Sequence, residues 1–318
     1  MITSFSWVFG RSMLFCMSFF VLNSSCLHGA ALNIVTTTTM ITDTVKQIGG
    51  DRVSVEGLMG PGVDPHLYKP AASDVLKLSR AKLVFYNGLL LEGKMSDLLD
   101  RLNKQGKAVF AVTENIAHSK LLKPANVQGH WDPHIWGDPR LWTKCVETIT
   151  TILIKHDPSG KQTYQANRDA YIKRLDKLIS WGMEQINGIA TEKRVLVTSH
   201  DAFNYFGNAF GLQVVGVQGI STVAEAPLAD IIHIVDFIKS RNVPAVFVES
   251  SVSPATIKRI SEDSGTKIGG ELFSDALGTT GEIESYKGLR FDLGTYEGWV
   301  GHNIATISKA LATPKTTP

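Results

Sequence analysis

Two runs of alternating strand and helix patterns, separated by one long helical pattern, constrain the fold of this 318-residue chain more than any other feature. The first run extends from Asn33 to Ile154, and the second extends from Arg194 to Leu311. Strands that alternate with helices are typical of a mainly parallel sheet with helices on both faces. The sequence therefore predicts an α/β fold with two similar lobes.

Between the two runs, apolar residues recur with helical spacing from Tyr164 to Ile189. A continuous helix of this length would extend about 40 Å. The stretch contains no proline, and its scattered charges do not follow a coiled-coil heptad. We therefore expect one stiff backbone helix that joins the lobes.

These patterns divide the chain into five segments. We expect a signal peptide over residues 1–31, an N-terminal lobe over 32–158, a linking helix over 159–192, a C-terminal lobe over 193–313 and a disordered tail over 314–318. Within the second lobe, we interpret residues 270–289 as one long loop that carries Asp275.

The N-terminal segment has the pattern of a secretory signal. Its only charged side chain is Arg11, and an apolar run begins at Met13 and gives way to small and polar residues. The apolar run is too short to span a bilayer comfortably. We expect export to the periplasm with cleavage near Ala30 or Ala31. Lipidation of Cys26 is the alternative, although residues 23–25 match the usual leucine-led box poorly.

The charge and cysteine content exclude some classes of protein. The chain has 32 lysines and arginines against 30 aspartates and glutamates, so its balance does not favour a nucleic-acid partner. Cleavage of the signal would leave Cys145 as the last cysteine, which excludes an intrachain disulfide. We expect Cys145 to be a buried thiol of the core.

An Asp-Pro-His sequence occurs twice, ending at His66 and at His134. Proline fixes its own φ and biases the preceding aspartate toward extended backbone, so each histidine is presented from a stiff loop. A stiff loop suits an imidazole that binds metal. Either copy alone is more often an ordinary surface histidine, and the repetition directs attention to further ligands.

Two further candidates follow predicted strands of the second lobe. His200 comes directly after the strand at Val195–Val197, and Asp275 follows a strand near Ile268. Ligands of open α/β sheets bind outside the carboxyl ends of the strands. Alone, a residue such as His200 is more often a core or capping histidine, and one such as Asp275 is more often a turn residue. Together with the two Asp-Pro-His histidines they predict a site between the lobes, with a donor set that suits zinc, manganese or ferrous iron.

Six runs of residues carry a resemblance to a known family. They are Leu58–Tyr68, Tyr86–Leu89, Asp132–Trp136, Val195–Phe203, Val248–Ser251 and Gly270–Ala276. With these runs the chain resembles the metal-binding receptors of zinc, manganese and iron ABC importers, the TroA/PsaA/ZnuA-like group of cluster A-I, and the TroA-type branch in particular. The resemblance extends from about Asn33 to Leu311.

The resemblance implies a transport function without enzymatic activity. It implies two α/β lobes joined by a backbone helix, with Zn²⁺, Mn²⁺ or Fe²⁺ bound between them by His66, His134, His200 and Asp275. It also implies delivery of the metal to the membrane subunits of an ABC permease that works with a cytoplasmic ATPase. Because the ligands must be deprotonated, we expect the metal affinity to fall as the pH drops through about 6.5.

The third ligand position bears on the choice of metal. Manganese-preferring receptors tend to have glutamate where this chain has His200, and a third neutral imidazole favours zinc or ferrous iron. The long acidic, histidine-rich loop and the second-lobe disulfide of zinc-specialised receptors are missing, which argues against strict zinc specificity. We interpret His118 and His130, in the loop before Asp132, as solvent-exposed.

Several neighbouring residues have supporting roles to which the sequence assigns alternatives. Asp64 and Asp132 either orient the ligands or cap their own turns. Glu249 either pairs with a basic group near the lobe interface or caps the following helix. Trp136 and Trp142 are expected to be packing aromatics, and Gly269-Gly270 is expected to let backbone pass close to the site.

Two other classes of function compete with a metal receptor. A secreted zinc hydrolase needs an open coordination position for water, which four protein ligands would close, and the chain has no His-Glu-x-x-His sequence and no nucleophile elbow. An adhesin is the other alternative, but the sequence has no dedicated adhesive repeat.

Overall fold

The computed structural model describes residues 1–2, 4, 30–123 and 129–312. Nearly all of the expected signal peptide, including Cys16 and Cys26, and the expected tail at 314–318 lie outside the described residues. Cys145 is buried, as expected for a core thiol.

The N-terminal lobe is built around a four-stranded parallel sheet with the order β2-β1-β3-β4. Its strands are β1 (Leu32–Thr36), β2 (Val53–Gly57), β3 (Leu83–Tyr86) and β4 (Val109–Ala111). Its helices are α1 (Thr39–Gly49), α2 (Ala72–Arg80), α3 (Ser96–Lys104) and α4 (Pro139–His156). Ile34 packs into the core under α1 and α4, whereas the next residue, Val35, packs into a second core with α2 and α3. Because helices cover both faces of the sheet, the central strand β1 carries apolar side chains on both faces.

The C-terminal lobe repeats this plan with the sheet order β6-β5-β7-β8. Its strands are β5 (Val195–His200), β6 (Gln213–Gln218), β7 (Ala245–Glu249) and β8 (Lys267–Leu272). Its helices are α6 (Asn204–Phe210), α7 (Leu228–Arg241), α8 (Ala255–Ser264) and α9 (Tyr296–Leu311). Along β5, Leu196 packs toward α6 and α9, whereas Val195 and Val197 pack toward α7 and α8.

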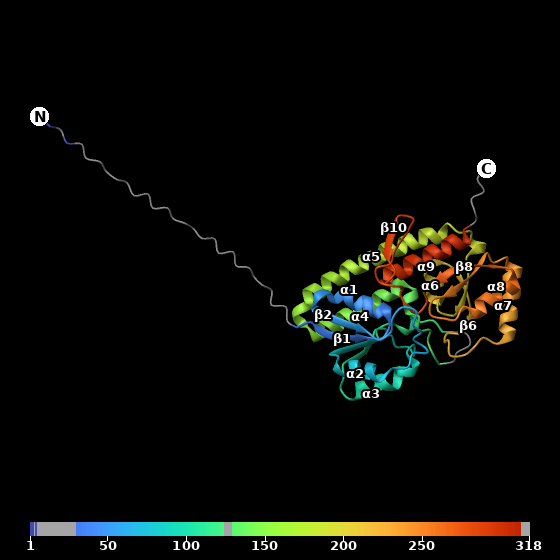
Figure 1. The fold of residues 1–318 in the computed structure, drawn as a ribbon, viewed down its shortest axis with the longest axis horizontal. Coiled ribbons are helices and arrows are strands. Elements are labelled where there is room, and N and C mark those ends of the chain that lie inside the picture. The colour runs from blue at the N-terminus through green and yellow to red at the C-terminus, as the bar shows by residue number, and fades with distance from the viewer. Residues whose placement is uncertain (3, 5–29, 124–128, 313–318) are drawn as a thin grey trace.

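One long helix, α5, lies along both lobes (Figure 1). It extends over Lys161–Asn187, 27 residues, and packs against α1 and α4 of the first lobe and against α9 of the second. This arrangement confirms the predicted α/β fold of two lobes joined by a backbone helix. The exact limits of the lobes at residues 158 and 193 stay a prediction. Neither α5 nor any other helix in the described ranges is long and apolar enough to cross a bilayer.

The prediction that residues 270–289 form one long loop is wrong. Strand β8 continues to Leu272, and the segment also contains β9 (Ile283–Tyr286), which pairs antiparallel with β10 (Leu289–Asp292). Lys287 and Gly288 join them with φ values of 46° and 82°, and positive φ at both central residues is typical of a tight hairpin turn. The hairpin is hard to predict because β9 is largely exposed and its turn lacks the usual Asn-Gly pair.

Gly269 and Gly270 lie in β8, next to α9. A Cβ atom at Gly269 would lie 2.7 Å from the Cβ of Ala310, and one at Gly270 would lie 2.7 Å from Cγ2 of Thr306. Both contacts are with α9. These glycines therefore allow β8 to pack closely on α9. That they also let backbone pass close to the site stays a prediction.

Candidate metal site

The four predicted ligands lie together between the lobes. His66 lies in the loop after β2, His134 precedes a short 3₁₀ turn at Ile135–Gly137, His200 ends β5, and Asp275 follows β8. Each offers one ligating atom, and these atoms all lie within 4.8 Å of one another. All four residues are buried, with exposed fractions of 5% or less.

The ligating atoms converge on a common point. Nε2 of His66 lies 3.3 Å from Nε2 of His134. The Asp275 carboxylate faces all three rings, with Oδ2 at 3.2 Å from Nε2 of His200 and 3.7 Å from Nε2 of His66, and Oδ1 at 3.6 Å from Nε2 of His134. Three nitrogens and a carboxylate directed inward form a cage of the size that a divalent transition metal requires.

Several of these buried atoms have no hydrogen-bond partner. Among the described residues they include Nε2 of His200 and both carboxylate oxygens of Asp275. Buried polar atoms are almost always paired, and an unpaired buried carboxylate costs several kcal/mol. A cation at the centre of the cage would satisfy all three atoms at once.

Asp132 orients the ring of His134. Its Oδ1 lies 2.7 Å from Nδ1 of His134 and also accepts a hydrogen bond of 3.0 Å from the backbone N–H of the same residue. A ring that donates through Nδ1 has its lone pair on Nε2, the atom that faces the site. Of the two alternatives for Asp132, the structure therefore supports ligand orientation.

Glu249 does the same for His200. Its Oε2 lies 2.6 Å from Nδ1 of the ring, and its Oε1 accepts from the backbone N–H at 2.9 Å. The basic group expected from the sequence as a partner of Glu249 is therefore His200, which is itself a candidate metal ligand. The sequence could not show this pairing, because it depends on β5 and β7 being neighbours in the sheet, and strand order was not predicted.

Asp64 supports His66 differently. Its Oδ1 accepts a 2.8 Å hydrogen bond from the backbone N–H of His66 and does not contact the ring. Its other oxygen, Oδ2, accepts from the hydroxyl of Thr222 at 2.5 Å. Asp64 therefore fixes the turn that presents the histidine, which is the capping alternative.

Burial and mutual charge shift the pKa values of the site. Burial lowers the pKa of His66 to about 3, so its ring is neutral and its lone pair is available at any physiological pH. Burial alone would raise the pKa of Asp275, but the imidazoles, His200 foremost, hold it well below the usual range. For His200, burial opposes the charged form, yet the carboxylates of Glu249 and Asp275 raise its pKa well above the ordinary value.

Comparisons with known proteins identify the family. Residues 34–310 match the family described as ZnuA, zinc-uptake complex component A, periplasmic. The chain belongs to this family. Its members are metal-binding receptors of ABC importers and not enzymes, which favours transport over the hydrolase alternative.

Two relatives illustrate the similarity. The manganese-binding lipoprotein MntA of Bacillus subtilis is 43% identical over 285 residues, covering 88% of this chain and 90% of the relative. The zinc-binding protein TroA of Treponema pallidum is 42% identical over 284 residues, covering 88% of each chain. The solved structure of the periplasmic zinc-binding protein TroA matches with a TM-score of 0.83 at 41% identity, over 89% of this chain and all of that one.

The segment that carries Asp275 is held firmly by other residues of this receptor. The carbonyl of Ser274 accepts hydrogen bonds from the indole N–H groups of Trp136, at 2.9 Å, and Trp299, at 3.1 Å. The side chain of Asn303 also accepts from the backbone of Phe273 at 2.9 Å. Trp136 is buried, as expected of a packing aromatic, and it also links the His134 turn to the Asp275 segment.

The other expected features of the N-terminal lobe lie apart from the cage. Trp142 is buried, as expected. His118 and His130 are exposed, as expected, and the His118 ring packs against Trp131 at 5.5 Å. Neither histidine belongs to the cluster formed by the four predicted ligands.

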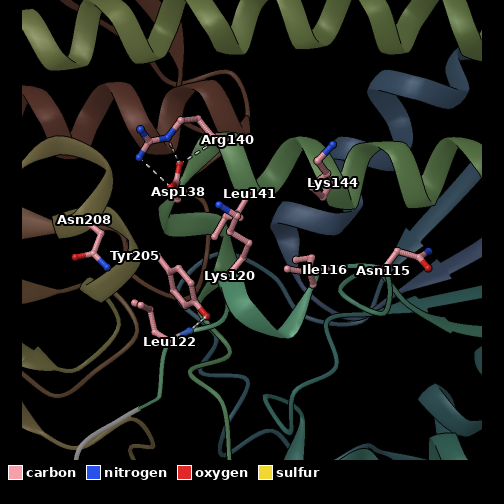
Figure 2. A pocket seen from close by; sticks show the side chains of 11 residues that line it. Asn115, Ile116, Lys120, Leu122, Asp138, Arg140, Leu141, Lys144, Tyr205 and Asn208 are labelled. Carbon is pink, nitrogen blue, oxygen red and sulfur yellow. Dashed lines mark hydrogen bonds and ion pairs between the residues drawn. The ribbon is translucent and has the colours of Figure 1, made fainter.

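A cavity of about 610 Å³ lies beside the junction of the lobes (Figure 2). It is lined by residues of 115–122, by the start of α4 and by α6. Its carboxylate, Asp138, is paired with Arg140 at 2.9 Å, and its other polar side chains are amides, lysines and a tyrosine. This set does not suit a transition metal.

Proposed function

We propose that this receptor captures one divalent transition metal between its lobes through His66, His134, His200 and Asp275, and delivers it to the permease subunits of an ABC importer. The observation that carries the proposal is the cage of buried ligating atoms, in which both oxygens of Asp275 have no hydrogen-bond partner. Four protein ligands fill all the coordination positions of a tetrahedral metal ion. This suits capture of the metal and leaves no open position for a catalytic water molecule.

For the identity of the metal, we propose zinc or ferrous iron ahead of manganese. Three neutral imidazoles with one carboxylate are softer than the oxygen-rich sets that manganese prefers. The relatives do not decide the matter, because MntA is named for manganese and TroA for zinc. The third imidazole, His200, supports the choice.

Elemental analysis and calorimetry test the proposed function. We expect one metal ion per chain in protein purified from its native host, and tight one-to-one binding of zinc by the metal-free protein. Assays for ester, peptide and phosphate hydrolysis should give no activity above that of free metal. A site that binds metal at a ratio well below one, or hydrolysis that is lost with the metal, would contradict the proposal.

For the location, we propose an exported receptor whose mature chain begins between Leu27 and Leu32. The apolar run followed by small residues motivates this range. Mass spectrometry of the intact mature protein measures its first residue directly. A diacylglyceryl group on Cys26 would instead show a lipid anchor, as the names of relatives such as the lipoprotein MntA state for those proteins.

A further inference from the structure

The two aspartates that support the N-terminal-lobe histidines both accept hydrogen bonds from the C-terminal lobe. Asp64, which fixes the turn of His66, accepts from Thr222 in the segment between β6 and α7. Asp132, which orients the ring of His134, accepts from Asn204 at the start of α6. Each support is therefore completed by a residue from the opposite lobe.

The two carboxylate oxygens of Asp64 accept hydrogen bonds from different lobes. Oδ1 accepts from the His66 backbone at 2.8 Å, and Oδ2 accepts from the threonine hydroxyl at 2.5 Å. Both residues are only partly exposed. With both oxygens engaged, the aspartate has one preferred rotamer, and the turn that carries His66 is fixed with it.

Two adjacent residues of the C-terminal lobe donate hydrogen bonds to Asp132, one to its side chain and one to its backbone. Nδ2 of Asn204 donates to Oδ2 at 3.2 Å, while Oδ1 is occupied by His134. The adjacent residue, Tyr205, donates its hydroxyl to the backbone carbonyl of Asp132 at 3.1 Å and accepts from the backbone N–H of Leu122 at 2.9 Å. Figure 2 shows this last contact, with the Tyr205 hydroxyl directed at Leu122.

We propose that Thr222 and Asn204 are positioning residues for metal capture, which couple the contact between the lobes to the orientation of His66 and His134. When the lobes are together, the C-terminal lobe supplies His200 and Asp275 and also fixes the two imidazoles of the N-terminal lobe. When the lobes separate, both aspartates lose a hydrogen bond, and the imidazoles lose orientation as well as partners. This inference rests on the proposed function of the same site.

The test compares two substitutions of one residue. Thr222→Val keeps the shape of the side chain and removes the hydroxyl, and we expect it to raise the zinc dissociation rate about tenfold, at the lower end of the range for residues that orient metal ligands. Thr222→Ser keeps the hydroxyl and should recover most of that loss. Stopped-flow mixing of the zinc-loaded protein with a chromophoric chelator measures the rate. Asn204→Leu should also accelerate release and provides a second variant if Thr222→Val fails to fold.

A matched control comes from α4. Thr151 is exposed, and its hydroxyl donates to the carbonyl of Glu147 in its own helix, so Thr151→Val should leave the dissociation rate unchanged. Thermal unfolding of the metal-free variants separates a positioning role from a structural one. We expect Thr222→Val and Thr151→Val to unfold within a few degrees of each other.

A double-mutant cycle identifies the route of the effect. In an Asp64→Ala background, Thr222→Val should add nothing, because the accepting carboxylate is already absent. The inference is overturned if Thr222→Val releases zinc at the wild-type rate, or if its effect is unchanged when Asp64 is removed. Failure of the proposed function would appear separately, as wild-type protein that binds less than one metal per chain.

Discussion

Replacement of His200 by alanine is expected to reduce metal affinity by at least about 100-fold. Four-ligand zinc sites bind with about 10–16 kcal/mol, so one ligand contributes about 3 kcal/mol, or about two factors of ten. His200 ends a buried central strand, and no other imidazole in the described ranges belongs to the ligand cluster apart from His66 and His134. A water molecule could fill the vacated position but would bind the metal more weakly than the fixed ring.

Competition with a chromophoric chelator measures this loss, and His66→Ala and His134→Ala should show losses of similar size. His118→Ala is the matched control, because His118 is an exposed histidine of the N-terminal lobe that does not belong to the cage. Thermal unfolding of each metal-free variant shows whether it is folded. One-to-one binding at wild-type affinity in all three ligand variants would place the metal elsewhere.

The coarse fold could be predicted from the sequence because its signals are local. Apolar strands bounded by glycine and proline, and helical spacing over α2 and α9, give the β-α alternation residue by residue. The candidate ligands could be predicted for a related reason. Parallel strands place their carboxyl ends at one edge of each sheet, so residues that follow the strands collect at that edge. His66 follows a strand of the first sheet and His200 ends a strand of the second, and the packing of the two lobes brings them together.

The partners of those ligands could not be predicted, because they depend on which strands and loops are neighbours. Glu249 ends β7 and reaches His200 only because β7 lies next to β5. Thr222 reaches Asp64 only because the lobes meet, and nothing in the sequence near either residue marks the contact. The β9–β10 hairpin was missed for a local reason, since each strand has only four residues and β9 is largely exposed.

The affinity for metal is expected to fall as the pH decreases across the neutral range, by at most about tenfold per unit for each proton that the metal displaces. The metal replaces whatever proton is held on the ligating nitrogens. His66 holds none, since burial lowers its pKa to about 3. We expect His200 to hold one in the metal-free protein, because the carboxylates of Glu249 and Asp275 outweigh the effect of burial and raise the pKa of His200 well above its ordinary value. Below that raised pKa, each metal bound releases one proton, so acid weakens binding and base strengthens it.

This pH dependence differs from the sequence-based expectation of a transition near pH 6.5, because the structure moves the pKa values of His66 and His200 in opposite directions away from it. Calorimetry at pH 7 in buffers with different ionisation enthalpies should report about one proton released per zinc. Glu249→Gln keeps an acceptor for Nδ1 of His200 but removes the charge that raises its pKa, so proton release at pH 7 should decrease and the dependence on pH should become weaker. An affinity that is constant from pH 7 to pH 8 in the wild type, with no proton released, would mean that His200 is already neutral in the metal-free receptor.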